Sequence, residues 1–308
     1  MGCNRLKLPS FASIKEVGPR DGLQNEKKIV GTKDKVKWIH MLADAGLSYI
    51  EVSSFVHPKW IPALADAQDV FAMLERNPQV TYAALVPNQN GLERALLQNV
   101  DEVNVFLSAS ETHNKKNINK SIDEALSVIE EVTKRSLFAG KMVRGYVSTV
   151  FGCPYEGEVD VHKVDELCNK LFSYGIYEVS LGDTIGVANP VQVERVLEHL
   201  LRKYDSSKFA MHFHNTYGMA LANVVKSLEC GITTFDSSCG GLGGCPYAPG
   251  ASGNVATNDL VHMLHKMGVQ TNINEEKLLQ ATKFIESKLD MQIPSHVYRA
   301  LQHKTVSR

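Results

Sequence analysis

The chain has 308 residues, a mass of 34.0 kDa and a formal net charge of -1, which suits one large α/β domain or two small ones. Hydrophobic residues make up 44% and charged residues 22%, which excludes a disordered chain and gives no basic excess for nucleic acid or an anionic membrane surface. Six cysteines without a CxxC pair, no signal-like apolar start and no run of about eighteen apolar residues predict a reduced, cytoplasmic protein that crosses no membrane.

Short β-branched runs alternate with longer amphipathic runs along the chain. The expected strands are residues 13–17, 48–53, 81–86, 102–107, 143–150, 177–181, 209–214 and 233–237. The expected helices between them are residues 33–45, 63–74, 89–97, 122–138, 161–174, 190–204 and 220–229. This alternation predicts a parallel sheet, and eight units favour a closed TIM (β/α)8 barrel. An open doubly wound sheet is the alternative, but GPRDGLQ follows the first strand instead of a phosphate-binding glycine motif.

The segment after the eighth strand differs from the repeating pattern. Residues 239–253 are the most glycine-rich part of the chain, and a helix is expected at about 254–266. Two further helices, near 275–289 and 295–302, have no paired strands and are interpreted as a cap on the barrel. No Pro- or Ser-rich linker separates them, so we expect a single domain over residues 1–308, with the barrel at about 13–267 and the C-terminal helical cap at about 268–308.

Two histidines stand two residues apart in the seventh expected strand, FAMHFHN. His212 and His214 should face the same side, because alternate residues of a strand do so. Asp21 follows strand one and Asn254 follows the loop after strand eight, and strands one, seven and eight adjoin in a closed barrel. Two nitrogens and two oxygens suit Mg²⁺ or Mn²⁺, while Zn²⁺ and Fe²⁺ stay open. Taken singly, the four residues are also consistent with core histidines, a turn and a helix N-cap.

Four further residues are candidates for catalysis around this site. Arg20 would bring positive charge that stabilises an enolate oxygen in a transition state, or it pairs with a nearby carboxylate. Glu51 near the end of strand two and Asp183 past strand six could orient Arg20 or a metal-bound water, or be solvated. Cys245 lies in GGLGGCP, and a thiol on such a flexible loop is a candidate proton donor to an enolate.

A basic and polar group follows strand four and continues in strand five. Lys115, Lys116 and Asn117 come first, and Arg144 and Tyr146 follow in the next strand. The two lysines could meet the phosphates of a large anionic cofactor tail. A solvated run of charge is the alternative for each lysine taken singly.

Taken together, these segments resemble the 3-hydroxy-3-methylglutaryl-CoA lyase family. The resemblance covers residues of about 13 to 290 and rests on the motifs EVGPRDGLQNE, VSSFVHPK, KKNIN, RGYVS, GCPYEG, SLGDTIG, HFHNT and GGLGGCPYAPGASGNVAT. The resemblance implies the following roles. The metal ligands are Asp21, His212, His214 and Asn254. The catalytic residues are Arg20, Asp21, Glu51, Asp183, His212 and Cys245, and the substrate contacts are Arg20, Asn117, Arg144 and Tyr146.

The resemblance also implies a reaction and partners. It implies a bacterial-type, cytoplasmic enzyme that uses Mg²⁺ or Mn²⁺ to cleave (S)-3-hydroxy-3-methylglutaryl-CoA into acetoacetate and acetyl-CoA, as in leucine degradation. The expected partners are an acyl-CoA thioester and a second copy in a homodimer, with no nucleic acid and no membrane. The alternatives are a lyase for a longer-chain 3-hydroxyglutaryl-CoA thioester, a related Claisen-condensing synthase, and a non-catalytic CoA-binding barrel.

Overall fold

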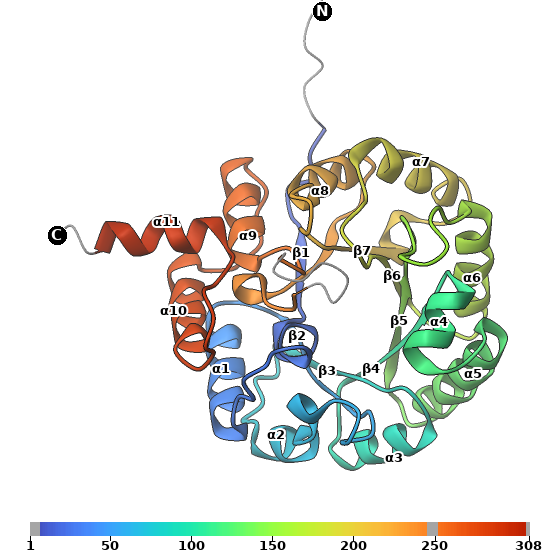
Figure 1. Cartoon of the computed structure of the whole chain (residues 1–308), viewed down its shortest axis with the longest axis horizontal. Coiled ribbons are helices and arrows are strands. Elements are labelled where there is room, and N and C mark those ends of the chain that lie inside the picture. The colour runs from blue at the N-terminus through green and yellow to red at the C-terminus, as the bar shows by residue number, and fades with distance from the viewer. Residues whose placement is uncertain (1–6, 245–251, 306–308) are drawn as a thin grey trace, which may run out of the picture.

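Eight parallel strands close into a barrel in which every strand pairs with its sequence neighbours and β8 pairs with β1 (Figure 1). A computed structural model describes residues 7–244 and 252–305. The strands are β1 Ser13–Glu16, β2 Tyr49–Ser54, β3 Thr81–Leu85, β4 Glu102–Ser108, β5 Met142–Ser148, β6 Glu178–Asp183, β7 Phe209–Phe213 and β8 Thr234–Ser237. The predicted barrel is confirmed, because all eight expected strands are present with ends that shift by two residues at most.

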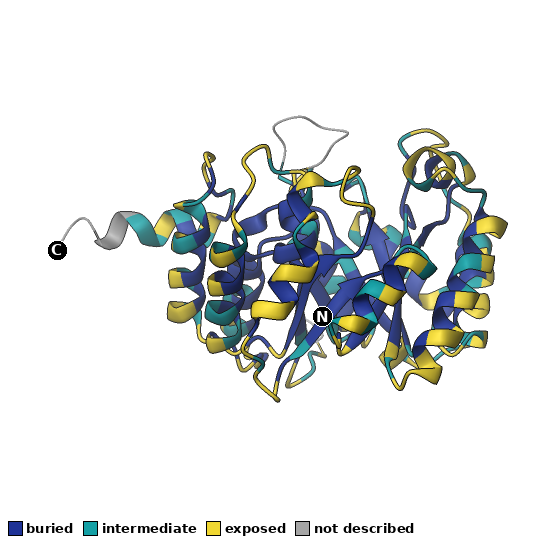
Figure 2. Cartoon of the chain, turned by 90° about the horizontal axis from the view of Figure 1, so that it is seen from below, coloured by how far each residue is buried: buried dark blue, intermediate teal, exposed yellow. Residues whose placement is uncertain are grey.

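Helices surround the barrel and connect successive strands. Those between the strands are α1 Thr32–Asp44, α2 Ala67–Met73, α3 Gln89–Leu97, α4 Glu111–Ile118, α5 Ile122–Phe138, α6 Val161–Ser173, α7 Pro190–Leu200 and α8 Ala220–Glu229. After β8 come α9 Thr257–Lys266, α10 Glu275–Glu286 and α11 His296–Thr305. Short helical turns are η1 Gly18–Gly22, η2 Pro62–Leu64, η3 Ser206–Lys208 and η4 Cys239–Gly241. Figure 2 shows buried strands enclosed by helices whose outer faces are exposed.

Three expected helices needed correction, and two elements were not expected. The helix expected at 190–204 ends at Leu200. The helix expected at 63–74 is divided into η2, which begins at Pro62, and α2. The helix expected from residue 254 begins at Thr257, because Asn254 pairs with His214 and Ala256 pairs with Ser238 in isolated β-bridges. Neither α4 nor η1 was expected, and both lie at the carboxyl ends of strands, where η1 comes directly after β1.

The strands place apolar side chains outward and polar side chains inward. The residues at alternate positions that join the apolar core include Ile50, Val103, Val105, Val143, Val179, Leu181, Met211 and Phe235. The positions between them are buried and polar, and they include Glu51, Glu102, Asn104, Arg144, Glu178, Ser180 and Asp236. Because a strand alternates its faces, the polar set fills the inside of the barrel. The barrel interior is therefore a network of hydrogen bonds and ion pairs below the site.

The additional C-terminal helices lie beside the barrel. α10 packs against α1 and α9, and α11 packs against α9 (Figure 1). Leu278, Ala281 and Ile285 of α10 are buried in the same apolar core as α1. The helices expected as a cap thus extend the helical ring at the side where the barrel closes. Among the described residues, no helix is long and apolar enough to cross a membrane.

Candidate metal and substrate site

The turn after β1 brings two charged side chains to the carboxyl end of the barrel. In η1 the carbonyl of Val17 accepts hydrogen bonds from the N–H groups of Arg20 at 3.2 Å, Asp21 at 2.7 Å and Gly22 at 3.2 Å. This wide turn, a single turn of π-helix, carries Pro19 at its start. Such turns are rare and are frequent at functional sites.

Among the described residues, Asp21, His212 and His214 form a cluster of side chains that could bind a metal ion. Each offers one ligand atom, and these atoms all lie within 4.8 Å of one another. The two imidazole rings have centroids 5.3 Å apart, as expected for alternate residues on one face of a chain segment. The aspartate comes from η1 and the histidines from β7 and the residue just after it, so the closure of the barrel joins them.

Asn254, the fourth predicted ligand, lies against the same cluster. Its side-chain nitrogen donates to Asp21 Oδ2 at 2.8 Å and to the carbonyl of Leu242 at 3.0 Å. Its backbone pairs with His214 in an antiparallel bridge. The nitrogen and oxygen of an amide are assigned from their hydrogen bonds, so rotation of the amide would present the oxygen to a cation instead.

The charges around the cluster favour a cation. Burial raises the pKa of Asp21, but Arg20 and the two histidines outweigh it and hold that pKa at about 2. Burial and the neighbouring His212 lower the pKa of His214 to about 4, which keeps this imidazole neutral. The pKa of His212 moves in the other direction, because contact with Asp236 outweighs the effect of burial. An anionic carboxylate beside a neutral imidazole is a pair of metal ligands ready to bind.

The donor set fits a divalent cation. The Nδ1 atom of His214 is buried and has no hydrogen-bond partner among the described residues, and Nδ1 of His212 lies 3.4 Å from Asp236 Oδ2. Two imidazoles, one carboxylate and one amide leave positions free for substrate oxygens in an octahedral site. The residues present therefore fit a divalent cation.

Arg20 is fixed by two carboxylates. Its Nε donates to Glu51 Oε2 at 2.5 Å, and its Nη1 donates to Asp21 Oδ1. Glu51 also accepts from Asn104 Nδ2 at 2.7 Å, and Gln24 donates to Asp21 at 2.8 Å. Glu51 is itself completely buried, so it contacts the guanidinium and not the solvent. The charge of Arg20 is thus held in one place next to the cluster.

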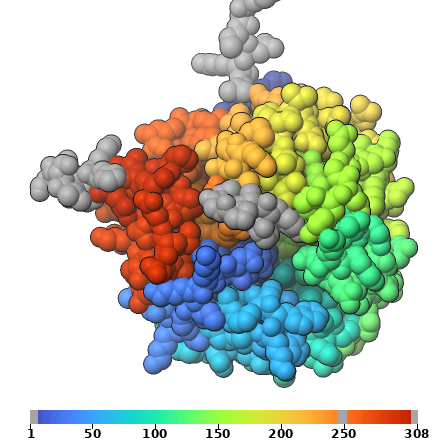
Figure 3. Space-filling view, in the orientation of Figure 1, coloured from blue at the N-terminus to red at the C-terminus, as the bar shows by residue number. Residues whose placement is uncertain are grey.

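A cavity of about 550 Å³ opens over Arg20 and the cluster. Its lining includes the predicted site residues Arg20, Asp21, Asn117, Tyr146, His212 and His214. Figure 3 looks onto this face, on which the blue segment after β1 and the green segment that contains α4 both lie. Lys120 also lines the cavity, whereas Lys115 and Lys116 are absent from the described lining. The cavity therefore has the candidate metal-binding cluster and basic and polar side chains in one lining.

Tyr146 contributes a hydroxyl that the protein leaves unused. The hydroxyl is buried and has no hydrogen-bond partner among the described residues. Its ring meets the His212 ring edge-on at 6.4 Å and lies 5.6 Å from the guanidinium carbon of Arg20. A buried hydroxyl without a partner is costly, so this group suits a polar atom of a bound molecule.

Asp183 and Arg144 lie behind the cavity lining. Asp183 accepts hydrogen bonds from the N–H groups of Val187 at 2.9 Å and Ala188 at 3.1 Å, and burial raises its pKa to about 7. It therefore shapes the loop between β6 and α7. Arg144 is completely buried, is not among the lining residues, and pairs with Asp236 and Glu178. Arg144 therefore lies in the barrel interior, and its contact with the substrate stays a prediction.

Some functional positions could not be assessed or were not expected. Cys245, the expected proton donor, lies outside the described residues. Asp236 and Ser180 were missed by the sequence reasoning, although they form hydrogen bonds next to His212. The available signal was the alternation of polar and apolar residues in TFDS and EVSLGD, which marks a polar barrel interior.

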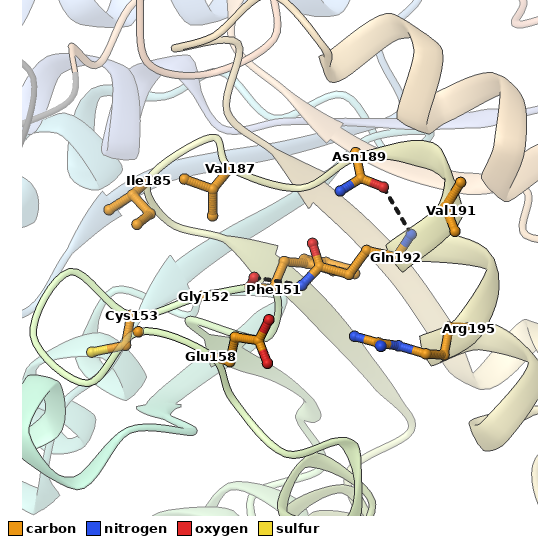
Figure 4. Close-up of a pocket in the computed structure, with 11 residues that line it drawn as sticks. Phe151, Gly152, Cys153, Glu158, Ile185, Val187, Asn189, Val191, Gln192 and Arg195 are labelled. Atoms are coloured by element: carbon orange, nitrogen blue, oxygen red, sulfur yellow. Dashed lines mark hydrogen bonds between the residues drawn. The ribbon is translucent and has the colours of Figure 1, made fainter.

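A second hollow of about 510 Å³ lies between the loop after β5 and the start of α7 (Figure 4). Asn189 accepts from the Gln192 N–H at 3.0 Å, and Gln192 Nε2 donates to the Phe151 carbonyl at 2.7 Å. These bonds cap α7 and join it to the preceding loop. None of the predicted site residues lines this hollow, so the chemistry belongs to the cavity over the cluster.

Comparison with known proteins agrees with this site. A family model described as HMGL-like matches residues 12–285. The chain is 58% identical over 290 residues to the Bacillus subtilis hydroxymethylglutaryl-CoA lyase YngG, covering 94% of this chain and 97% of that one. The crystal structure of a Bacillus subtilis HMG-CoA lyase superposes with a TM-score of 0.95 at 56% identity, over 96% of this chain and 99% of that one. An Acinetobacter baumannii HMG-CoA lyase in complex with coenzyme A and 3-methylmalate has a TM-score of 0.90 at 39% identity and covers 97% of both chains.

Proposed function

The chain belongs to the HMGL-like family, and from that premise we propose how its residues carry out the reaction of a hydroxymethylglutaryl-CoA lyase. Lyase activity itself follows from 58% identity over 94% of the chain to such an enzyme. The observation that carries the mechanism is the cluster of Asp21, His212 and His214 beside Arg20, on the floor of one cavity. The activity is a carbon–carbon cleavage of 3-hydroxy-3-methylglutaryl-CoA into acetoacetate and acetyl-CoA.

The metal ligands of this proposal are Asp21, His212, His214 and Asn254. A bound Mg²⁺ or Mn²⁺ supplies Lewis-acid polarisation of the substrate oxygens. The protein supplies an anionic carboxylate and a neutral imidazole at neutral pH, in keeping with the lowered pKa values of Asp21 and His214. Asn254 lies beside the cluster and donates a hydrogen bond to Asp21 of η1.

The bond cleavage needs a base and a stabilised enolate. A base takes the C3 hydroxyl proton, the C3 oxygen becomes the ketone of acetoacetate, and the electron pair of the C2–C3 bond passes to the thioester as an enolate. The base is His212 or Asp21, the two groups of the cluster to which the proposal assigns this proton. Arg20, fixed by Glu51, stabilises the enolate oxygen with a charge that need not reorganise. Tyr146 offers its free hydroxyl to a substrate oxygen.

Cys245 is proposed to protonate the enolate carbon, which yields acetyl-CoA. The thiolate it leaves recovers a proton from solvent or from the base. We expect Cys245→Ser to lower turnover at least a hundredfold while Mn²⁺ affinity stays unchanged, because a hydroxyl is a much weaker acid than a thiol. Steady-state turnover and calorimetric titration of Mn²⁺ measure the two effects. Near-normal turnover in this variant would remove the thiol from the mechanism.

The coenzyme is proposed to lie along the rim formed by α4 and the residues after it. Coenzyme A is bound in the Acinetobacter baumannii lyase, and Asn117 and Lys120 line the cavity here. An ammonium group and an amide at a rim suit the phosphates and amides of such a tail. We also propose a homodimer in the cytoplasm. Light scattering after size-exclusion chromatography tests the dimer, and a mass near 34 kDa would contradict it.

The decisive experiment is a coupled assay for acetoacetate. Purified protein is incubated with 3-hydroxy-3-methylglutaryl-CoA as prepared, after treatment with EDTA, and after readdition of Mg²⁺ or Mn²⁺. We expect activity to disappear with the chelator and to return with either cation. Full activity in the chelated protein would contradict the metal site. A panel of thioesters with longer C3 substituents in the same assay separates this activity from that of a longer-chain lyase, and acetyl-CoA with 2-oxo acids tests for a synthase.

A further inference from the structure

The buried layer beneath the cluster contains a carboxylate that faces a metal-ligand histidine. Asp236 of β8 is paired in register with His212 of β7, so the two side chains project into the barrel side by side. Asp236 Oδ2 lies 3.4 Å from His212 Nδ1. Asp236 has no access to solvent from this position, since only 1% of its surface is exposed.

Asp236 is held by two further interior residues. Arg144 Nη2 donates to Oδ1 at 2.8 Å, and Arg144 Nη1 lies 3.4 Å from Oδ2. Ser180 donates to Oδ2 at 2.6 Å, so this oxygen is shared between a hydroxyl and the histidine. Arg144 is held in turn by Glu178, whose Oε1 is 2.6 Å from Nε. Residues of β5 and β6 thus hold the carboxylate that β8 carries.

His212 Nδ1 depends on this carboxylate. The atom is buried, and among the described residues no partner meets all the geometric criteria of a hydrogen bond with it. The acceptor that lies beside it is Asp236 Oδ2, at 3.4 Å. The two nitrogens of an imidazole point to different sides of the ring. Because Nδ1 faces Asp236, Nε2 is the nitrogen that could bind a cation. In metal sites, a carboxylate on the second nitrogen of a ligand histidine fixes the tautomer and the ring orientation.

We propose that Asp236 is the positioning residue of His212, and that Arg144 and Ser180 act through it by fixing its carboxylate. The inference rests on the proposed metal site and adds three residues to it. It also gives Arg144 a role that its burial permits, since this side chain does not reach the cavity lining. The arrangement neutralises a buried carboxylate with a guanidinium, which allows the carboxylate to stay charged inside the barrel.

Affinity for Mn²⁺, measured by calorimetry on the EDTA-treated and dialysed protein, tests this role. We expect Asp236→Asn to weaken Mn²⁺ binding about 10- to 100-fold, the range found when such supporting groups are removed. Ser180→Ala should weaken it about threefold to tenfold, because it frees Oδ2 without removing the carboxylate. Turnover at saturating Mn²⁺ should recover largely in Ser180→Ala, since ring orientation is then imposed by the metal.

Glu178→Gln is the matched control. Glu178 Oε1 lies 2.6 Å from Arg144 Nε and 2.9 Å from Lys15 Nζ, so this variant changes the same buried network. It contacts neither Asp236 nor His212. Its Mn²⁺ affinity should stay within about twofold of the parent. Equal loss of affinity in Glu178→Gln and Asp236→Asn would overturn the proposal, because it would show a general disturbance of the barrel. Unchanged affinity in Asp236→Asn would overturn it as well.

A second measurement on the unaltered protein does not depend on how the variants fold. Nitrogen-15 NMR of metal-free protein with labelled histidine reports which ring nitrogen of His212 carries the proton, with His212→Gln used to assign the signal. Protonation of Nδ1 is expected, and a neutral ring protonated on Nε2 would overturn the proposal. Failure of the parent protein to bind Mn²⁺ would instead contradict the proposed metal site, so the two failures are distinct.

Discussion

At the residue scale, Arg20 shows how a charge is prepared for a transition state. Its guanidinium is buried, forms ion pairs with Glu51 and Asp21, and lines the cavity. We expect Arg20→Gln to lower kcat by about 100-fold or more with a smaller change in KM, because a fixed charge acts mainly on the enolate. Steady-state kinetics separate kcat from KM. A rise in KM at unchanged kcat would show that Arg20 only binds the substrate.

Arg76→Gln is the control for that variant. Arg76 donates to the carbonyls of Gln98 and Asn99 and pairs with Asp101 on the surface, away from the cavity lining. Its kcat and KM should match those of the parent. A comparable loss in this control would point to damaged folding and not to lost catalysis.

Glu16 is a second residue whose burial has a measurable consequence. Its Oε1 accepts from the N–H groups of Gly18 and Cys239 at 2.8 Å each, and its Oε2 accepts from Thr257 at 2.7 Å. It thus fastens η1, η4 and the start of α9 to one another. Burial raises its pKa to about 7 in spite of these hydrogen bonds, so the carboxylate form is disfavoured in the folded protein.

The sign of the pH effect follows from this raised pKa. Between the unfolded pKa near 4.5 and the folded pKa of about 7 the folded state binds more protons, so Glu16 lowers stability as pH rises through that window. The loss is about 3 kcal/mol at the upper end, at 1.36 kcal/mol per pKa unit. Glu16→Gln should remove this part of the pH dependence and keep the hydrogen bonds from Gly18 and Cys239, while its amide nitrogen would donate to Thr257 instead of accepting from it.

Urea unfolding from pH 5 to pH 8 measures the Glu16 contribution. The free energy of unfolding of Glu16→Gln should fall less than that of the parent over this range. Glu158→Gln, at an exposed site, should follow the parent. Identical pH profiles for the parent and Glu16→Gln would show that the buried carboxyl keeps an ordinary pKa.

At the element scale, the segment after η4 packs so closely against η1 that Gly243 leaves no room for a side chain. Gly243 has φ of +99°, and a Cβ placed there would lie 2.6 Å from Asn254 Nδ2 and 3.0 Å from the Asp21 carbonyl. We expect Gly243→Ala to weaken Mn²⁺ binding by about tenfold or more, because it displaces two proposed ligands. Calorimetric titration with Mn²⁺ measures the effect.

A glycine with a similar backbone supplies the control for Gly243. Gly140 has φ of +72° and no atom within 4 Å of the added Cβ. Gly140→Ala should lower stability by about 1 kcal/mol through backbone strain and leave Mn²⁺ affinity unchanged. Unchanged affinity in both variants would show that the segment yields without moving Asn254.

The two elements that sequence reasoning missed lie where the chain departs from regular periodicity. α4 has the sequence ETHNKKNI, which is almost wholly polar, so it carries little apolar repeat. Its N-cap Ser110 accepts from the His113 N–H at 3.0 Å, and its residue Asn117 lines the cavity. η1 has the sequence GPRDG, in which Gly18 followed by Pro19 is typical of a turn. Both elements depend on tertiary contacts rather than on their own pattern.

At the scale of the whole molecule, the C-terminal helices belong to the barrel core. Leu278 of α10 is 1% exposed and lies in the same apolar cluster as Trp38 and Ile39 of α1. We propose that residues 1–308 unfold as one cooperative domain. Leu278→Ala should then lower the free energy of unfolding by about 2–5 kcal/mol and shift a single transition without a change in its slope.

Denaturant unfolding followed by both fluorescence and circular dichroism measures that transition. Leu97→Ala is the control, since this side chain is 78% exposed and its removal should change stability by less than about 0.5 kcal/mol. Two separate transitions in Leu278→Ala would show that the C-terminal helices form a domain of their own.

The sequence alone predicted the eight strands, most of the helices and the residues Asp21, His212 and His214, which the structure brings together. Apolar repeats of period two and 3.6 are local, so the eight strands and α5 could be located closely, and His212 and His214 share a face for the same local reason. The family motifs added the substrate, which spacing does not encode.

Only the tertiary structure decided which polar groups meet. Neighbouring strands place Asp236 beside His212, and they bring Ser180 and Arg144 into hydrogen bonds with Asp236. Such pairings depend on strand register and barrel closure, which bring together residues 92 positions apart in the case of Arg144 and Asp236. A local pattern carries no information about that distance, so the network that supports the site became visible only in the folded chain.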